Sequence, residues 1–210
     1  MPPKVRITKE DIVTASVNMV REQGVQVLNA RAIAAHMGCS TQPIFSNYAS
    51  MDELKQDVMQ QAYNLYLHFL EKEAENNQYP KYKASGMGYI RFAKEEKELF
   101  KLLFMRDRSN ESMNDDFDDS TQAIIQGLGK SLGLSYENAK RYHLEMWIYV
   151  HGIATMLATS YLPLEWDDIS ALITDVYEGM KKQYVKVQLI IVNKGTKNIF
   201  LPKKGALVPW

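Results

Sequence analysis

Residues 29–48 have the sequence NARAIAAHMGCSTQPIFSNY, which predicts two short helices joined by a tight turn. Asn29 is a good N-cap for a first helix from Ala30 to Met37, whose alanines allow a second helix to cross it closely. Gly38 suits the left-handed backbone that ends this helix, and Ser40 is expected to cap the next one. These signals together indicate a helix-turn-helix.

The second of these helices has the length and polarity needed to enter a DNA major groove, which is about 12 Å wide. Its outward face is supplied by Thr41, Gln42 and Ser46. Pro43 falls in the first turn, where its missing N–H is tolerated. Because a glutamine amide can contact the N6 and N7 positions of adenine together, Gln42 is the candidate for reading a base.

Helices are predicted on both sides of this segment. Thr8 caps a helix that carries an apolar stripe and ends at Gly24, and Ser50 caps a long helix that runs to about Asn76. After a loop ending at Pro80, helical patterns are expected over residues 83–94, 96–105, 117–132, 136–161 and 167–184. The chain is therefore predicted to be all-α in its main part.

The C-terminal tail has a different pattern. Residues 185–192 are rich in β-branched side chains, residues 193–196 contain a turn signal, and residues 198–201 are suited to a second strand. The tail is expected to be a short β-hairpin, an irregular segment or a segment docked on a neighbour, and the sequence leaves these alternatives open.

The pattern over about residues 8–60 resembles the DNA-binding domain of the TetR family of transcriptional regulators. The similarity rests on residues 29–48 and on the SMDEL sequence at 50–54. The sequence WIYVHG at 147–152 is similar to a Trp-x-x-x-His-Gly signature of one subgroup of TetR ligand-binding domains.

This resemblance implies an all-α architecture. It places an N-terminal three-helix helix-turn-helix DNA-binding domain at 1–50, a helical ligand-binding and dimerisation domain at 51–184, and a tail at 185–210. The last two helices are expected to pair with those of a second copy, with a close-packed face formed by Trp147, Val150, Gly152 and Ala154.

The function implied is a ligand-responsive transcriptional regulator. We expect a repressor that binds a palindromic double-stranded DNA operator as a homodimer and is released by an unidentified small molecule. The alternative is a helical homodimeric ligand-binding or interaction module with weak or lost DNA binding. The formal net charge of zero favours the alternative, as do Phe45, Asn47 and Met51, which depart from the usual family residues at phosphate-contacting positions.

The residues expected to contact DNA surround the helix-turn-helix. They are Lys4, Arg6, Asn29, Arg31, Thr41, Gln42, Pro43, Phe45, Ser46, Asn47 and Lys55. Because Arg31 is the one permanent positive charge within residues 29–48, we expect Lys4 and Arg6 of the N-terminal arm to supply much of the phosphate affinity.

Aromatic and methionine-rich helix faces in the C-terminal part allow two interpretations. Core packing is the first explanation, and a pocket for an apolar ligand is the second. The pocket candidates are Tyr66, Phe92, Phe104, Met105, Trp147 and His151.

Other classes of function find little support in the sequence. We expect no metal site or cofactor, since the four histidines share no metal-ligand spacing, and no enzyme, since no nucleophile–base arrangement is visible. Cys39, the only cysteine, is either a buried small side chain or a redox switch. With neither a signal peptide nor a run of about 18 apolar residues, the protein is expected to be cytoplasmic and without a membrane partner.

Overall fold

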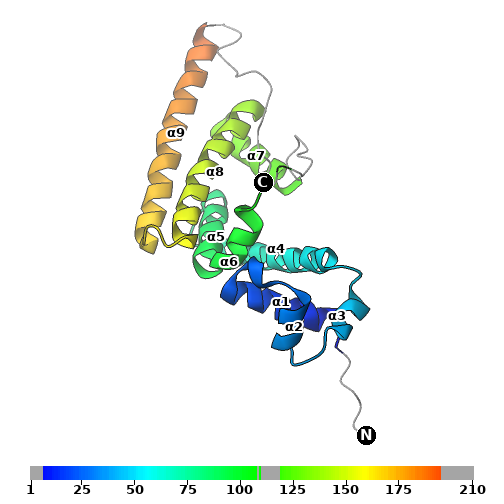
Figure 1. Cartoon of the computed structure of the whole chain (residues 1–210). Helices are drawn as coiled ribbons and strands as arrows, with labels where there is room; N and C mark the ends of the chain where they lie inside the picture. The colour runs from blue at the N-terminus through cyan, green and yellow to red at the C-terminus, as the bar shows by residue number, and fades with distance from the viewer. Residues whose placement is uncertain (1–6, 108, 110–118, 195–210) are drawn as a thin grey trace.

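The described parts of the chain are built from helices joined by short connections. The computed structural model describes residues 7–107, 109 and 119–194 (Figure 1). In these ranges the chain is helical and contains no strand. The elements are α1 (Lys9–Gln23), the short 3-10 helix η1 (Val25–Val27), α2 (Ala30–His36), α3 (Gln42–Asn47), α4 (Met51–Glu75), α5 (Lys81–Glu95), α6 (Lys97–Phe104), α7 (Asp119–Leu132), α8 (Tyr136–Ala158) and α9 (Trp166–Lys194). The prediction of an all-α chain is confirmed.

Side-chain caps fix the starts of four of these helices: α1, α2 and α4, described next, and α8, whose cap is Ser135. The Thr8 hydroxyl accepts a hydrogen bond from the backbone N–H of Asp11 at 3.1 Å, and the Asp11 carboxylate accepts one from the Thr8 N–H at 2.9 Å. Asn29 caps α2 and Ser50 caps α4 by the same kind of contact. Each cap satisfies a backbone donor that the helix itself leaves without a partner, which is why these starts were predictable.

The start of α3 differs from the prediction that Ser40 caps it. Gly38 adopts a φ of +65°, and the Gly38 and Cys39 N–H groups donate to the carbonyl oxygens of Ala35 and Ala34. This double closure of α2 extends the turn through Ser40, so α3 begins only at Gln42, with Thr41 at the cap position and no side-chain cap.

The helices of the N-terminal part share one small core. Ile12 of α1, Ile33 of α2, Ile44 of α3 and Leu54 of α4 are all buried, with at most 1% of each side chain exposed. Helix α4 therefore belongs to this core at its first turns. It then continues across to the C-terminal helices, and lies between the two parts of the molecule (Figure 1).

The C-terminal part is a bundle in which α8 packs on α5 and α7, and α9 lies alongside α8 (Figure 1). Helices α4 and α5 approach closely at Gly88. A Cβ atom at this position would lie 3.0 Å from the Phe69 carbonyl oxygen and 3.1 Å from the Leu70 Cα. A glycine is therefore required for this helix contact.

The β-hairpin alternative for the tail is wrong over residues 185–192, because these residues continue α9 to Lys194. β-Branched residues lower helix propensity by only a few tenths of a kcal/mol each, and extending an existing helix avoids the cost of starting a new one. The proposed second strand at 198–201 lies outside the described residues. No helix in the described ranges has the length and hydropathy to cross a membrane.

Candidate nucleic-acid interface and bundle cavity

The outward surface of α2 and α3 brings most of the predicted contact residues to one end of the molecule. Arg31, Gln42, Phe45 and Ser46 are exposed, while Thr41 and Pro43 are half-buried beside them. Phe45 has 55% of its side chain exposed, which is unusual for a large apolar residue. Since only Ile44 of α3 is buried in the core, the rest of this short helix is available to a partner.

Two asparagines predicted to reach phosphate also hold the local fold. The Asn29 carbonyl oxygen accepts from the Ala32 N–H at 2.9 Å, and its amide donates to the Val27 carbonyl at 3.2 Å. The Asn47 amide donates to the carbonyl oxygens of Pro43 at 2.8 Å and Ile7 at 3.4 Å. Both asparagine side chains thus make hydrogen bonds within the protein.

The positively charged side chains predicted to contact DNA differ in their surroundings. Arg31 is exposed and has no carboxylate partner among the described residues. Lys55 is exposed and forms an ion pair with Asp52 at 3.5 Å. Lys4 and Arg6 lie outside the described residues.

Lys9 precedes the motif but is bound to the protein itself. Its ammonium donates to Glu53 of α4 at 2.9 Å and lies 4.5 Å from the centre of the Tyr48 ring. The hydrogen bond to Glu53 raises the pKa of Lys9. Lys9 thus joins α1 to α4 and to the end of α3.

Cys39, in the turn between α2 and α3, is a half-buried free thiol.

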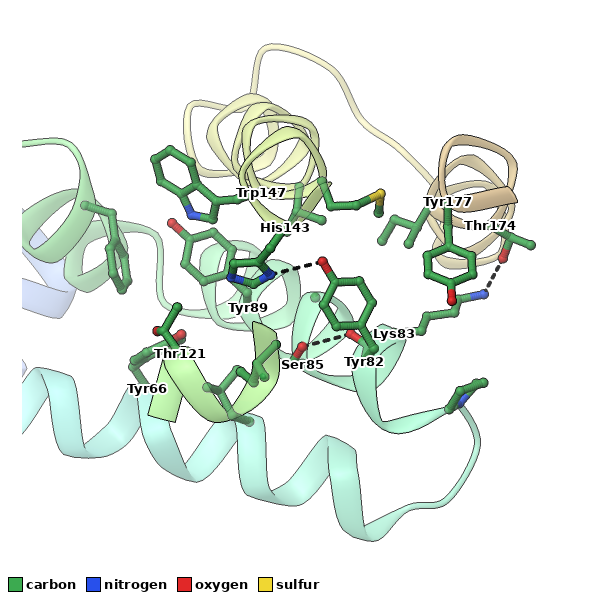
Figure 2. Close-up of a pocket in the computed structure, with 18 of the residues that line it drawn as sticks. Tyr66, Tyr82, Lys83, Ser85, Tyr89, Thr121, His143, Trp147, Thr174 and Tyr177 are labelled. Atoms are coloured by element: carbon green, nitrogen blue, oxygen red, sulfur yellow. Dashed lines mark hydrogen bonds between the residues drawn. The ribbon is translucent and has the colours of Figure 1, made fainter. Parts of the chain in front are cut away.

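The second candidate site is a partly open cavity of about 600 Å³ in the C-terminal bundle (Figure 2). Its walls come from α4, α5, α7, α8 and α9, with Phe104 of α6 contributing as well. This volume lies in the range of about 300–1,000 Å³ that is typical of small-molecule sites. The lining is dominated by tyrosine, tryptophan and aliphatic side chains.

Three of the six predicted pocket residues line this cavity, namely Tyr66, Phe104 and Trp147. The other three do not. Phe92 is fully buried with its ring 5.6 Å from that of Tyr66, and Met105 is 41% exposed. His151 packs behind Trp147, with stacked rings 4.9 Å apart.

The residues that sequence reasoning missed lie mainly on α5 and α9. On α5 they are Tyr82, Lys83, Ser85, Gly86 and Tyr89, and on α9 they are Ile173, Thr174, Tyr177, Glu178 and Lys181. Both sets recur at intervals of three and four residues, which is the spacing of one helix face. That periodicity was a usable signal, but it does not distinguish a cavity wall from a packed core.

Two tyrosine–histidine hydrogen bonds join α5 to α8 at the cavity. The Tyr82 hydroxyl is 3.0 Å from His143 Nδ1, and the Tyr89 hydroxyl is 2.8 Å from His151 Nδ1 (the first is drawn in Figure 2). Burial lowers the pKa of His143 to about 4 and also lowers the pKa of His151. His143 is therefore a neutral hydrogen-bonding group in the cavity wall at neutral pH.

Within the described residues, no group of three or more histidine, cysteine, aspartate or glutamate side chains is arranged to hold a metal ion.

In the comparisons with known proteins, residues 82–178 match a family model described as a tetracyclin repressor-like, C-terminal domain. No curated protein matches the chain. The matched range covers α5 from its second residue, α6 to α8, and the first part of α9, with every cavity-lining residue of α9 except Lys181.

Proposed function

The chain belongs to the TetR family of transcriptional regulators, and from this premise we propose that it is a repressor that binds a palindromic operator as a homodimer and is released by a small molecule. The observation that carries the proposal is the position of α4. Tyr63, Tyr66, Leu67 and Leu70 of this helix line the cavity, and the same helix packs on α1, next to the helix-turn-helix.

The first turns of α4 are tied to the helix-turn-helix by polar contacts. Asp57 accepts a hydrogen bond from the Tyr48 hydroxyl at 3.0 Å, and Glu53 holds both Lys9 and the Ala49 N–H. A displacement of α4 by a ligand would therefore be transmitted to α3. The ligand changes DNA affinity only if it binds the two positions of α4 with different affinities.

The proposed dimer interface uses the outer faces of α8 and α9. Ile148 is 58% exposed, and Gly152 and Met156 follow it at intervals of four residues on the same face of α8. The dimer face predicted from sequence needs correction, because Val150 and Ala154 are buried inside the protomer and Trp147 lines the cavity.

Analytical ultracentrifugation tests the dimer. The protein is expected to sediment as a dimer at micromolar concentration, and Ile148→Glu is expected to shift it to a monomer because a charge cannot be buried there without a partner. Val25→Glu places the same charge on an exposed apolar residue of η1 and should leave the dimer intact. A monomeric parent protein would contradict the proposal.

Fluorescence anisotropy with DNA from upstream of the coding sequence tests the DNA-binding role. We expect a specific complex whose affinity falls linearly with salt on a log–log plot. Gln42→Ala should cost about 1–3 kcal/mol at one operator position, whereas Arg31→Ala should weaken all sequences equally. Gln126→Ala, an exposed glutamine on α7, is the matched control.

The alternative function, a ligand-binding or interaction module with weak or lost DNA binding, is favoured by the internal engagement of the Asn29 and Asn47 amides. It predicts ligand binding and a dimer, but no specific complex at any salt concentration. The anisotropy experiment therefore separates the two functions.

A further inference from the structure

The cavity has two chemically different ends. Tyr66, Tyr89, Thr121 and Trp147 surround one end, which is largely aromatic, and Lys83, Thr174 and Tyr177 lie at the other (Figure 2). The basic end lies where α5 meets α9. A ligand that fills the cavity therefore meets apolar rings along most of its length and a cation at one end.

Lys83 is the cation best placed to select a ligand. Its ammonium donates to the hydroxyls of Ser170 at 2.7 Å and Thr174 at 2.8 Å, and it lies 4.8 Å from the centre of the Tyr79 ring. In the described part of the chain no carboxylate pairs with it. Hydroxyl groups orient the ammonium but do not neutralise its charge. Lys83 is half-buried, and this partial burial lowers its pKa.

The other ionisable groups of the lining leave this charge without compensation. Glu178 and Lys181 form an ion pair with each other at 3.5 Å. His143, between the two ends, is neutral at neutral pH. The charged side chains that line the cavity are thus one carboxylate and two ammonium groups, which leaves one positive charge.

We propose that the cavity takes an amphipathic carboxylate, with an aromatic or aliphatic body among the aromatic rings and one carboxylate group at Lys83. This inference rests on the proposed function, because it names the ligand class of the regulatory cavity. A carboxylate gives Lys83 the counter-charge that it lacks. A neutral ligand would leave the ammonium uncompensated, and a cationic ligand would be repelled by it.

Calorimetric titration with three probes of nearly equal size tests the ligand class. The probes are 2-naphthylacetate, its neutral amide 2-naphthylacetamide, and the cation 2-naphthylethylammonium. The parent protein should bind the carboxylate at least about tenfold more tightly than the amide, since a charge-assisted hydrogen bond is about twice as strong as a neutral one. The amine should bind most weakly.

Variants assign the preference to Lys83. Lys83→Met should weaken carboxylate binding about tenfold and leave amide binding unchanged, and Lys83→Arg should keep most of the preference. Lys81→Met removes a charge from an exposed position on the same helix, outside the cavity lining, and should change nothing. Near-ultraviolet circular dichroism of each variant checks that the fold is retained.

Several outcomes would overturn the inference: equal binding of carboxylate and amide, tightest binding of the amine, no binding of any probe, or a carboxylate preference that survives Lys83→Met. Binding is measured without DNA, and operator binding is measured separately without probe. If the parent protein binds its operator but shows no carboxylate preference, the ligand class alone is refuted. If it shows the carboxylate preference but does not bind an operator, the proposed function alone is refuted.

Discussion

The helix-turn-helix and the C-terminal bundle differ in how their sequences determine their structures. In the helix-turn-helix the decisive groups are close in sequence, such as Asn29 and the Ala32 N–H that it caps. In the bundle the decisive contacts join residues far apart, such as Tyr82 and His143. The first part can be read from short segments, whereas the second depends on how whole helices pack.

The two parts also differ in what their interiors contain. The N-terminal core is filled by aliphatic side chains from four helices, while the bundle holds an open volume of about 600 Å³. An open volume forgoes packing energy, so the surrounding helices need other contacts to hold them apart. Polar contacts between helices provide these, and they offer the largest expected effects on stability.

Arg91→Met is expected to have the largest effect. Arg91 donates to Glu73 of α4 at 2.7 Å and lies 4.1 Å from the centre of the Trp166 ring at the start of α9. Glu73 is 1% exposed, so loss of Arg91 leaves a buried charge unpaired and should lower the free energy of unfolding by about 3–5 kcal/mol. Urea denaturation measures this.

The control for this variant is Glu95→Gln. Glu95 is an exposed partner of the same guanidinium, 3.7 Å away, and should change stability by less than about 1 kcal/mol. The double variant Glu73→Gln with Arg91→Met should recover much of the loss, because no charge then remains buried. A small effect of Arg91→Met would show that the bundle does not depend on this contact.

The next effect is a pH dependence from His143. Its pKa is about 4 in the folded protein, against about 6.5 for a free histidine. Between these values the unfolded chain binds a proton that the folded chain does not, so this contribution to stability is full above pH 6.5 and is lost as the pH falls towards 4. The difference corresponds to about 3 kcal/mol.

His143→Gln keeps a hydrogen-bonding group near Tyr82 but cannot titrate. Its stability relative to the parent protein should therefore improve by about 2–3 kcal/mol between pH 7 and pH 4.5. Thermal unfolding at several pH values measures this, and His68→Gln, on the exposed face of α4, is the control. Parallel pH curves for the parent and His143→Gln would place His143 in a solvated site.

The sequence alone predicts the helix starts of the N-terminal part well and the cavity lining less well. The starts of α1, α2 and α4 could be predicted, because Thr8, Asn29 and Ser50 cap helices within three residues of themselves. The cavity could be predicted only in part. Whether Tyr89 or Phe92 faces the open volume depends on the rotation of α5 against α8, and no local signal records that rotation.

Gly88→Ala tests the packing of α4 on α5, which sets the position of the cavity wall. The added Cβ would meet the α4 backbone at 3.0–3.1 Å, and backbone atoms cannot move aside cheaply. We expect a loss of about 1–3 kcal/mol by urea denaturation. Gly127→Ala in α7, with no atom within 4 Å of the added Cβ, should instead stabilise by up to about 1 kcal/mol.

The smallest expected effect concerns the positively charged arm that precedes α1. Arg31 is the only permanent positive charge within residues 29–48, and Lys9 is held by Glu53, so the proposal assigns much of the phosphate affinity to Lys4 and Arg6. Deletion of residues 2–6 removes both charges. If each neutralises one phosphate, the slope of log affinity against log salt should fall by about 0.9 per contact, or nearly two in all.

The preference among operator variants should survive this deletion, because phosphate contacts carry no base information. The comparison with Gln42→Ala is then direct: the deletion changes the salt slope and leaves base preference intact, and Gln42→Ala does the reverse. An unchanged slope in the truncated protein would assign the phosphate contacts to Arg31, Lys55 and the backbone amides instead. In that case the affinity and the specificity would both reside in the helix-turn-helix and the first turns of α4, where the local sequence signals are strongest.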